Sequence, residues 1–559
     1  PGPYAFMWFE LQQPPEPETR VAELDRLHVA AGWESLLAGP MLERLESALL
    51  PAFLLKQRWF GGKSRSIRSA SVVDWGEFAS SGAALAFVDV WYDDGAAESY
   101  LLALAMNFAA ESEVPTSAVV CPISSPAGEG VLHDAAYDVA ARDALLAFIE
   151  RGGRVPTRHG VVTGTPSETL ARLRGPGGER LTATRASAEQ SNTSIIYGKR
   201  LILKLFRRQE PGVNPDCEVG RYLTEVRHFA HVPAFAGTID YTRNGTQFAT
   251  LAMLQALVSH QGDGWTRTLE RLDRYFEECA SSQYPGDERR SGEWDVVELS
   301  EEQESPLARE SIGISLDEAS MLGQRTAEMH VALSSPTDDR AFAPEPLSDA
   351  HLQVLGLEFH DHAGRVFDDL KEGLSTLPDE IVEIAGLVLS RRRAILETFR
   401  QLGTDHIGGL RTRIHGDYHL GQVVAVKNDY VILDFEGEPS RSLVERRAKH
   451  SPLKDVAGML RSFSYAAWAA LLNYAARRPE SLARLEPWAN FWQRATAGAF
   501  LRAYRASAAD APFMPATRDG FETLLEAYVL DKALYELQYE LNHRPDWVRI
   551  PLHGVLELR

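Results

Sequence analysis

Alternating apolar and polar positions predict that the first half of the chain is rich in short strands. Alternation indicates a strand because successive side chains point to opposite faces of a sheet. Turn signals separate the segments, and Asn244-Gly245 is typical of a tight hairpin turn. The predicted strands cover residues 71–78, 84–93, 98–106, 180–188, 193–199, 200–206, 236–242 and 246–254, with a weaker one at 1–12.

Helical spacing of apolar residues dominates the second half. The same spacing predicts helices over 20–60 and 131–151, and Asn214-Pro215 is typical of a helix start. After residue 258 the pattern is mostly helical, apart from short strands within 411–440. Residues 281–310 lack a period and are rich in Ser, Pro, Gly and Glu, so we expect a mobile acidic loop there.

Composition narrows the possible partners. The 559 residues carry a formal net charge of −20, which disfavours binding to nucleic acid or to anionic lipid. No apolar stretch reaches the roughly 18 residues that a membrane span requires. Cys121, Cys217 and Cys279 are too few and too widely spaced for a disulfide framework or a zinc site, which favours a reducing cytoplasm.

The clearest chemical signal lies within residues 414–437. Asp417 occupies a polar turn, Gln422 follows five residues later, and Asp434 follows twelve residues after that, at the end of an apolar strand. Phosphoryl transfer needs a carboxylate that takes the proton of the acceptor hydroxyl, and oxygen ligands that hold Mg²⁺ on ATP. Protein kinases use an Asp, an Asn five residues later and an Asp-Phe-Gly. The spacing therefore predicts Asp417 as the base and Gln422 and Asp434 as metal ligands.

Glu436 stands where the kinase pattern has its glycine, and it can add an acidic ligand or contact a substrate. The competing interpretation of the whole segment is a hairpin with acidic turns and a capping His. The complete ordered set favours catalysis, and a strand-rich lobe followed by a helical lobe with an embedded hairpin is the order of a two-lobed kinase.

A lysine within an apolar strand indicates where the nucleotide binds. Lys204 is the one charged residue of Leu201–Phe206, and a buried ammonium needs a counterion or a phosphate. Glu218, in the helix that starts at Asn214, is the expected partner, as in the kinase Lys–Glu pair. Glu225 is the second choice, and a lysine that reaches solvent from an edge strand is the alternative.

Two further segments are expected to complete the ATP site. The loop before the strand of Lys204 contains Ser191, Asn192 and Thr193 but no glycine, so hydroxyl and backbone groups are expected to cover the phosphates. A plain polar turn is the alternative. Residues 251–258 end the last strand and should form the interlobe hinge, with backbone groups of Met253 to Gln255 facing adenine.

Together these segments resemble the maltokinase family, the ATP:maltose 1-phosphotransferases of a bacterial trehalose–maltose–glucan route. The resemblance implies an α+β, two-lobed, protein-kinase-like (aminoglycoside-phosphotransferase-like) fold with an N-terminal cap subdomain. It also implies ATP and Mg²⁺ as cofactors, and for Asp417, Gln422 and Asp434 the roles given above. The matching segments are QRWFGGKSR (57–65), SNTS with LILKLFRR (191–208), NPDCEVGRYLTE (214–225), GDGW (262–265), HGDYHLGQV (415–423), DFEGEPSR (434–441), SPLKDVAGMLRSF (451–463) and YELQYELNHRPDW (535–547).

Two departures from the family pattern concern the hinge and one loop. The hinge reads Gln255-Ala256-Leu257, where an acidic residue is expected after the Gln, and residues 281–310 are longer than usual. The expected domains are a strand and linker at 1–19, a cap at 20–110, an ATP-binding lobe at 111–258 and a mostly helical lobe at 259–559. Residues 1–12 resemble the last strand of trehalose synthase, so a trehalose synthase domain, fused or separate, is an expected partner.

The acceptor sugar is expected against the last long helix. Sugars are held by aromatic faces and polar groups, and Tyr535 and Tyr539 share one helix face. Arg544 lies near the stripe of Glu536, where it can clamp a hydroxyl or pair with that carboxylate. A packing helix with a solvated acidic edge is the alternative. The residues assigned to the acceptor are His415, Glu436, Tyr535, Glu536 and Arg544, with maltose as the sugar and maltose 1-phosphate as the product.

Two other functions fit the same residues. One is phosphorylation of another sugar or amino sugar, as by a glucosamine kinase, because the catalytic motifs handle ATP and any hydroxyl. The other is a catalytically silent regulatory module of trehalose synthase, which the complete catalytic set disfavours.

Overall fold

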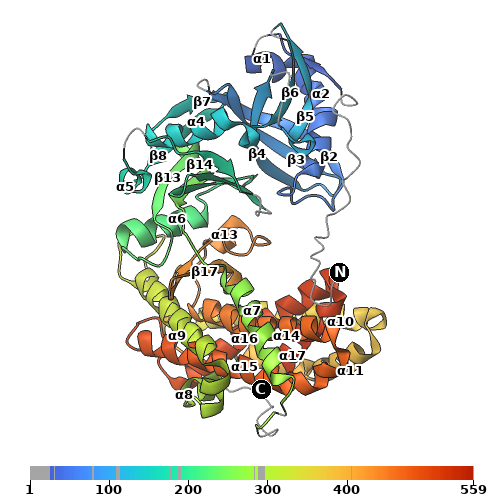
Figure 1. Ribbon diagram of the computed structural model, residues 1–559, viewed down its shortest axis with the longest axis vertical. Helices are drawn as coiled ribbons and strands as arrows, with labels where there is room; N and C mark the ends of the chain where they lie inside the picture. Colours follow the sequence, from blue (N-terminus) through green and yellow to red (C-terminus); the bar gives the residue numbers. More distant parts are fainter. Residues whose placement is uncertain are drawn as a thin grey trace, which may run out of the picture. The chain divides into compact units, whose positions relative to one another are not determined.

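The computed structural model describes residues 25–557, with the exception of 31, 79–80, 109–113, 127, 177–178, 187–190, 283, 287–295 and 405. The strand predicted at 1–12 lies outside the described residues. The chain divides into two compact units, each of which is described by itself (Figure 1). Unit 1 contains the described residues up to Asn214 together with Phe235–Leu257. Unit 2 contains Pro215–Ala234 and the described residues from Val258 onward.

The first sheet of unit 1 has its strands in the order β1-β5-β6-β4-β3-β2, with β12 paired to β4. Strand β1 runs parallel to β5, and the other described neighbours run antiparallel. The sheet continues past residue 110, because β5 and β6 belong to it. Its strands are β1 Leu27–His28, β2 Ile67–Phe78, β3 Ala83–Tyr92, β4 Ala97–Asn107, β5 Val119–Ser125, β6 Gly128–Asp134 and β12 Arg208–Gln209.

The second sheet of unit 1 has the order β7-β8-β13-β14-β11-β10-β9 and is antiparallel throughout the described strands. The predicted hairpin turn joins β13 to β14, where Asn244 and Gly245 have φ values of 52° and 77°. These positive angles match a tight hairpin turn. The strands are β7 Arg154–Pro156, β8 Gly160–Pro166, β9 Ala183–Arg185, β10 Asn192–Tyr197, β11 Leu201–Phe206, β13 Phe235–Arg243 and β14 Thr246–Ala256.

Strand β3 is buried on both faces and contributes to two hydrophobic cores. Leu85 and Phe87 belong to a core that both sheets share with α4. Ala86 and Val88 belong to a second core that includes the N-terminal helices. Neighbouring side chains enter different cores because they point to opposite faces of the strand. The helices of unit 1 are α1 Gly32–Leu36, α2 Gly39–Arg44, the π-helical η2 Leu45–Leu49, α3 Leu50–Lys56, α4 Val139–Glu150 and α5 Leu170–Arg174, with short 3₁₀ turns η3 Thr116–Ala118 and η4 Ala135–Tyr137.

The helix predicted over 131–151 begins later than expected. Residues 131–134 belong to β6, and α4 begins at Val139 after the N-cap Asp138, whose side chain accepts the backbone N–H of Ala141. The strand and the helix are both apolar, so apolar spacing alone did not separate them.

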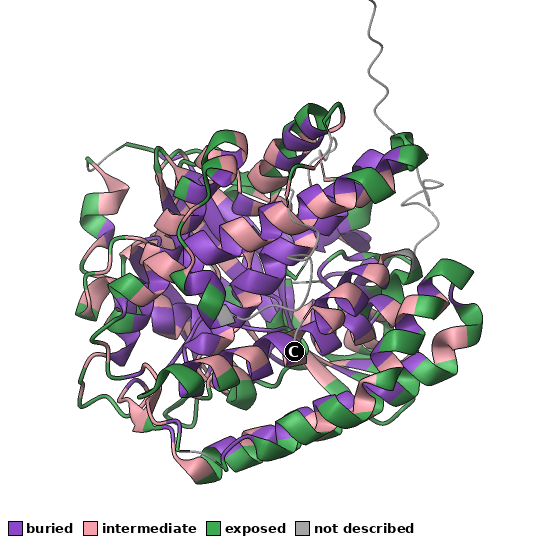
Figure 2. Cartoon of the chain, turned by 90° about the horizontal axis from the view of Figure 1, so that it is seen from below, coloured by how far each residue is buried: buried purple, intermediate pink, exposed green. Residues whose placement is uncertain are grey.

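Unit 2 is mainly helical and contains one continuous hydrophobic core. Buried residues gather on the faces by which its helices pack, and exposed residues lie on the outer faces (Figure 2). No helix among the described residues is both long and apolar enough to cross a membrane. The helices are α6 Pro215–Arg221, the π-helical η5 Tyr222–Val226, α7 Gly264–Cys279, α8 Val296–Glu301, α9 Pro306–Ser334, α10 Asp349–Gly373, α11 Asp379–Ser390, α12 Arg392–Gln401, α13 Leu443–Arg446, α14 Leu453–Arg477, α15 Leu482–Ser507, α16 Arg518–His543 and α17 Arg549–Leu556.

Short elements complete unit 2. Strand β15 Glu345–Pro346 pairs with β16 Leu410–Arg411, and β17 Val423–Val426 pairs with β18 Asp429–Ile432. The 3₁₀ turns are η7 Leu374–Thr376, η8 Leu420–Gln422, η9 Pro479–Ser481 and η10 Pro545–Trp547. Part of the loop predicted over 281–310 is helical, because α8 and the start of α9 fall within it. Ser305 caps α9 by accepting the backbone N–H of Ala308 at 3.1 Å, a signal that the low-periodicity composition obscured.

A buried ion pair connects the two sheets of unit 1. Arg207 and Asp134 have side chains that are 1% and 3% exposed, and Arg207 Nη2 donates to Asp134 Oδ2 at 2.6 Å. The guanidinium carbon of Arg207 also lies 4.8 Å from the centre of the Trp59 ring.

Asp134→Asn should destabilise unit 1, because Arg207 would stay buried without a counter-charge. Removing one partner of a buried pair costs about 3–5 kcal/mol, whereas an exposed pair contributes about 0–1 kcal/mol. Asp143→Asn is the matched control, because Asp143 pairs with Arg180, whose side chain is 78% exposed. Urea unfolding should show a clearly larger loss of stability for Asp134→Asn. Equal losses in the two variants would contradict this role of the pair.

Candidate active site

A buried carboxylate holds the turn that carries Asp417. Asp455, near the start of α14, accepts the backbone N–H of His415 at 2.8 Å and that of Gly416 at 2.9 Å. Its Oδ2 also lies 3.1 Å from Nε2 of His330 on α9. Burial raises the pKa of Asp455, but the hydrogen bond and charge of His330 outweigh burial and lower this pKa overall. Asp455 is therefore an anion that accepts these N–H groups at neutral pH.

His415 supports the same turn from its side chain. The side chain is buried, and its Nε2 lies 2.8 Å from the carbonyl oxygen of Leu433, which only an N–H can satisfy. Nδ1 is then the acceptor, 3.4 Å from the backbone nitrogen of Asp417. The assignment of His415 to the acceptor sugar is therefore wrong, because both ring nitrogens are used to position the turn.

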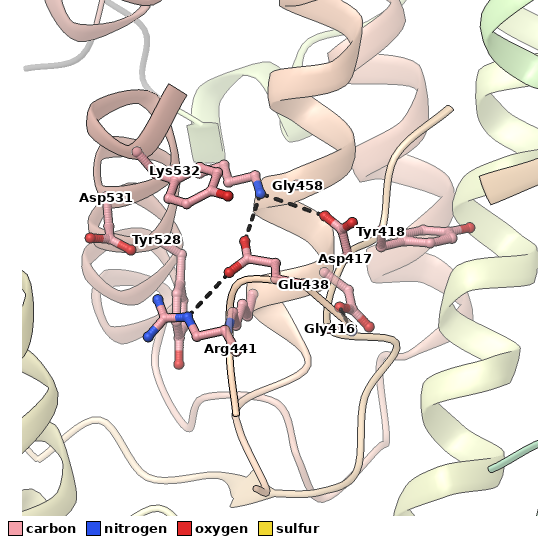
Figure 3. A pocket seen from close by; sticks show the side chains of 12 residues that line it. Gly416, Asp417, Tyr418, Glu438, Arg441, Gly458, Tyr528, Asp531 and Lys532 are labelled. Atoms are coloured by element: carbon pink, nitrogen blue, oxygen red, sulfur yellow. Dashed lines mark hydrogen bonds and ion pairs between the residues drawn. The ribbon is translucent and has the colours of Figure 1, made fainter. Parts of the chain in front are cut away.

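Asp417 itself faces a pocket between α14, α16 and the segment after β18 (Figure 3). Lys532 Nζ lies 3.7 Å from Asp417 Oδ1 and 2.8 Å from Glu438 Oε1. Arg441 Nε pairs with Glu438 Oε2 at 3.2 Å. Tyr535 lines the same pocket, and its ring centre lies 4.6 Å from Lys532 Nζ.

Glu438 and Lys532 keep their charges near neutral pH. Burial raises the pKa of Glu438, but the ammonium groups of Lys532 and Lys454 outweigh burial and bring this pKa to about 2. Burial lowers the pKa of Lys532, but Glu438 and Asp417 outweigh it and raise this pKa above its usual value. Fixed charges of both signs can therefore orient the hydroxyl groups of a polar acceptor.

Three carboxylates meet next to the end of β18. Asp216, Asp434 and Glu436 each offer an oxygen, and these oxygens lie within 4.8 Å of one another. Asp434 has a φ of 64°, an uncommon left-handed conformation for a residue with a side chain. The backbone N–H of Phe435 donates to Asp216 Oδ1 at 2.9 Å, which ties this turn to α6. Carboxylate oxygens are the ligands that Mg²⁺ prefers, so the donor set fits the expected cation.

Gln422 lies beside this carboxylate cluster, where its Nε2 donates to Asp434 Oδ2 at 3.3 Å. The structure thus brings together the predicted ligands Gln422 and Asp434 with Glu436. It adds Asp216, which the sequence interpretation missed. An acid in the first turn of a helix is expected for electrostatic reasons alone, so Asp216 gave no separate signal.

Glu218, the expected partner of Lys204, is bonded within unit 2. Its Oε2 accepts from Arg413 Nη1 at 2.7 Å and its Oε1 from Arg447 Nη2 at 2.7 Å. Burial raises the pKa of Glu218, but Arg447 and Arg413 outweigh it and lower this pKa overall. Both carboxylate oxygens are thus occupied by arginines, which differs from the predicted pairing with Lys204.

Lys204 lies in β11, as predicted, and is half-buried between Ser194 of β10 and Met253 of β14 in the neighbouring strands. Strand β14 extends to Ala256, past its predicted end at residue 254, and pairs with both β11 and β13. Pairing on both sides engages backbone groups of this strand in its ladders, and contact of the Met253 to Gln255 backbone with adenine stays a prediction.

The predicted phosphate loop is only partly free to serve that role. Thr193 is buried in β10, and its Oγ1 accepts from Arg207 Nε at 2.8 Å. Its hydroxyl oxygen therefore supports the arginine of the buried ion pair with Asp134, and its contact with ATP stays a prediction. Ser191 is exposed and Asn192 is buried, and their contact with ATP stays a prediction.

The acceptor residues predicted on α16 have other partners than expected. Glu536 accepts from Arg461 Nη2 at 2.7 Å, and Arg544 pairs with Glu540 at 2.7 Å. The suggested pair of Arg544 with Glu536 is wrong, because Glu540 lies one helical turn nearer to Arg544. The hydroxyl of Tyr465 also donates to Glu540, whose Oε2 is buried without a hydrogen-bond partner among the described residues.

Sequence reasoning missed the charged pair at the centre of the pocket. Lys532 and Glu438 are 94 residues apart, and this separation hides their contact. A weak signal existed, because Lys532 precedes Glu536 by one helical turn and so shares its face.

Comparisons with known proteins support a kinase-like fold with a cap. Residues 53–138 match the family model of the maltokinase N-terminal cap domain. A solved glucosamine kinase in complex with glucosamine, ADP and inorganic phosphate superposes with a TM-score of 0.59 at 20% identity, covering 92% of this chain and 98% of that one. The mixed α+β, kinase-like fold with an N-terminal cap that the sequence predicted is thereby confirmed.

Curated relatives point to the same group of kinases. A glucosamine kinase of Streptacidiphilus jiangxiensis is 23% identical over 437 residues, which cover 77% of this chain and 83% of that protein. A glucosamine kinase of Mycolicibacterium smegmatis (strain ATCC 700084 / mc(2)155) is 31% identical over 179 residues, which cover 30% of this chain and 39% of that protein. The chain is thus similar to sugar-kinase sequences over most of its length and carries a maltokinase-type cap.

Asp216→Asn should weaken divalent-cation binding by about tenfold or more, because the cluster loses one anionic oxygen while the acceptor for Phe435 N–H remains. Mn²⁺ titration in the presence of ADP, followed by electron paramagnetic resonance, gives the affinity. Asp273→Asn is the matched control, since this exposed acid of α7 pairs with Arg477 on the surface. Unchanged Mn²⁺ affinity in Asp216→Asn would remove Asp216 from the set of ligands.

Proposed function

We propose that this chain is an ATP- and Mg²⁺-dependent sugar kinase that converts maltose to maltose 1-phosphate. The observation that carries the proposal is the placement of Asp417 at a pocket with fixed charges, in the same unit as a cluster of carboxylates suited to Mg²⁺. The match of residues 53–138 to a cap domain named for maltokinase supports maltose as the acceptor.

Asp417 is the proposed general base. Its carboxylate accepts the proton of the acceptor hydroxyl, and the sugar oxygen forms a bond to the γ-phosphorus of ATP as the bond to the ADP oxygen breaks. The electron pair of the broken bond leaves with ADP. The hydrogen bonds that the backbone N–H groups of His415 and Gly416 donate to Asp455 fix the turn, so the carboxylate of Asp417 needs little reorganisation in the transition state.

Oxygen ligands for the cation come from Gln422, Asp434, Asp216 and Glu436. A bound Mg²⁺ supplies neutralisation of charge on the ATP phosphates. Lys204, with Ser191 and Asn192, is proposed to contact ATP from unit 1, on the strength of the family resemblance.

The acceptor is proposed to lie against α16. Lys532 and Glu438 can donate to and accept from sugar hydroxyls, and the ring of Tyr535 can cover an apolar face of a pyranose. Glu536 offers a further acceptor on the same helix.

Glucosamine or another amino sugar is the second candidate acceptor. The relatives that span most of the chain carry that name, and the acids Asp417, Glu438 and Asp531 line the pocket. The pairing of Glu438 with both Lys532 and Arg441 weighs against it, because this negative charge is already neutralised. A trehalose synthase partner stays a prediction from residues 1–12, which lie outside the described residues.

A panel of acceptors tests the function. The chain is incubated with ATP and MgCl₂ and with maltose, glucose, trehalose or glucosamine, and ADP release is measured for each. Proton–phosphorus NMR then locates the phosphate, because coupling to the anomeric proton identifies a 1-phosphate. Maltose should give the highest kcat/KM. A preference for glucosamine would establish the second candidate, and no transfer to any sugar would favour a silent module.

Asp417→Asn should lower kcat by about 10²–10⁴-fold while ATP affinity stays close to that of the unmodified chain, because the amide keeps the shape but cannot take the proton. Asp361→Asn is the matched control, since Asp361 is an exposed acid of α10 beside His360. Calorimetric titration with ATP accompanies the rate measurement. Retention of more than about a tenth of the rate would exclude Asp417 as the base.

A further inference from the structure

Arg461 of α14 holds one oxygen of Glu536. The Arg461 side chain is 3% exposed, and its Nε and Nη2 both donate to Glu536 Oε2, at 3.1 and 2.7 Å. Nη1 donates to Ser464 Oγ at 3.3 Å on the same helix. Because both bonds converge on Oε2, the other oxygen of Glu536 has no hydrogen-bond partner among the described residues and is left for another donor.

The position of the Arg461 guanidinium depends on a glycine of another helix. A Cβ placed at Gly554 of α17 would lie 2.1 Å from Arg461 Nη1 and 2.5 Å from its Cζ. Such distances are far inside van der Waals contact, so any side chain at this position would displace the guanidinium. Arg461 is a long flexible side chain, and it can give way without a shift of the helices.

We propose that Arg461 is a positioning residue for the acceptor, and that Gly554 lets it set the orientation in which Glu536 meets a sugar hydroxyl. This inference rests on the proposed function, in which Glu536 contacts the acceptor. Helix α17 thereby contributes to acceptor selectivity, although neither Gly554 nor Arg461 is among the residues that line the pocket of Asp417.

A purely structural ion pair is the competing explanation, and the two differ in what a substitution changes. If Arg461 positions Glu536, its substitution changes the KM for the acceptor sugar and leaves the KM for ATP unchanged. If the ion pair is purely structural, the substitution lowers the stability of the protein and changes both KM values. Arg461→Lys keeps the charge but loses the planar fork that places two N–H groups on one oxygen. Gly554→Ala keeps Arg461 but displaces its guanidinium group.

The experiment compares kinetics and melting temperatures of Arg461→Lys, Gly554→Ala, Glu536→Gln and the double variant of Arg461→Lys with Glu536→Gln. Gly386→Ala on α11 is the matched control, since a Cβ there meets nothing within 4 Å. Each of the first two variants should raise the KM for maltose by about tenfold, which corresponds to the loss of one charge-assisted hydrogen bond. The KM for ATP and the melting temperature should stay close to those of Gly386→Ala.

The double variant decides whether Arg461 acts through Glu536. If it does, the double variant has about the same maltose KM as Glu536→Gln alone, because the two effects are coupled. Multiplied effects, equal changes in both KM values, or an unchanged maltose KM in Glu536→Gln would each overturn the positioning role. A chain active on maltose with unchanged Arg461→Lys and Gly554→Ala constants would reject this inference alone. A chain that phosphorylates no sugar would reject the proposed function together with it.

Discussion

The candidate active site depends on one buried carboxylate. Asp455 accepts two consecutive backbone N–H groups from the turn before Asp417, and its own charge is held by His330. A buried N–H group left without a partner costs about 1–3 kcal/mol, so the turn has one strongly favoured conformation. The ring of His330 in turn lies 2.9 Å from the hydroxyl of Tyr504 on α15. The packing of α9, α14 and α15 therefore determines the position of the Asp417 carboxylate.

The sequence predicted the parts of the site whose residues lie close together along the chain. Asp417, Gln422 and Asp434 share one turn and one short hairpin, so their spacing already contains most of their geometry. The tight turn at Asn244-Gly245 was predictable for the same reason, since local backbone preference decides it. Alternation predicted part of the strands of unit 1, with errors at their ends, but it missed β5, β6, β7 and β8 entirely.

What the sequence could not predict depends on contacts between distant residues. Glu218 meets Arg413 and Arg447 across 195 and 229 residues, and neither arginine stands out in its own segment. The extension of β14 to Ala256 follows from pairing with two neighbouring strands, which no single segment contains. The commitment of Thr193 to Arg207 likewise depends on Asp134 in the other sheet. In each case the contact depends on a tertiary partner that the local pattern does not contain.

Strand β3 limits how the chain can vary in length. Its odd-numbered residues from Ala83 to Phe87 serve one core, and its even-numbered residues from Ala84 to Val90 serve the other. The two sets differ in volume, because one contains Leu85 and Phe87 while the other is built from alanine and valine. One inserted or deleted residue would turn each set of side chains toward the opposite core. The phenyl ring of Phe87 would then enter the core built for small residues, and the other core would be left with cavities. Length changes during evolution should therefore be confined to the turns that flank this strand.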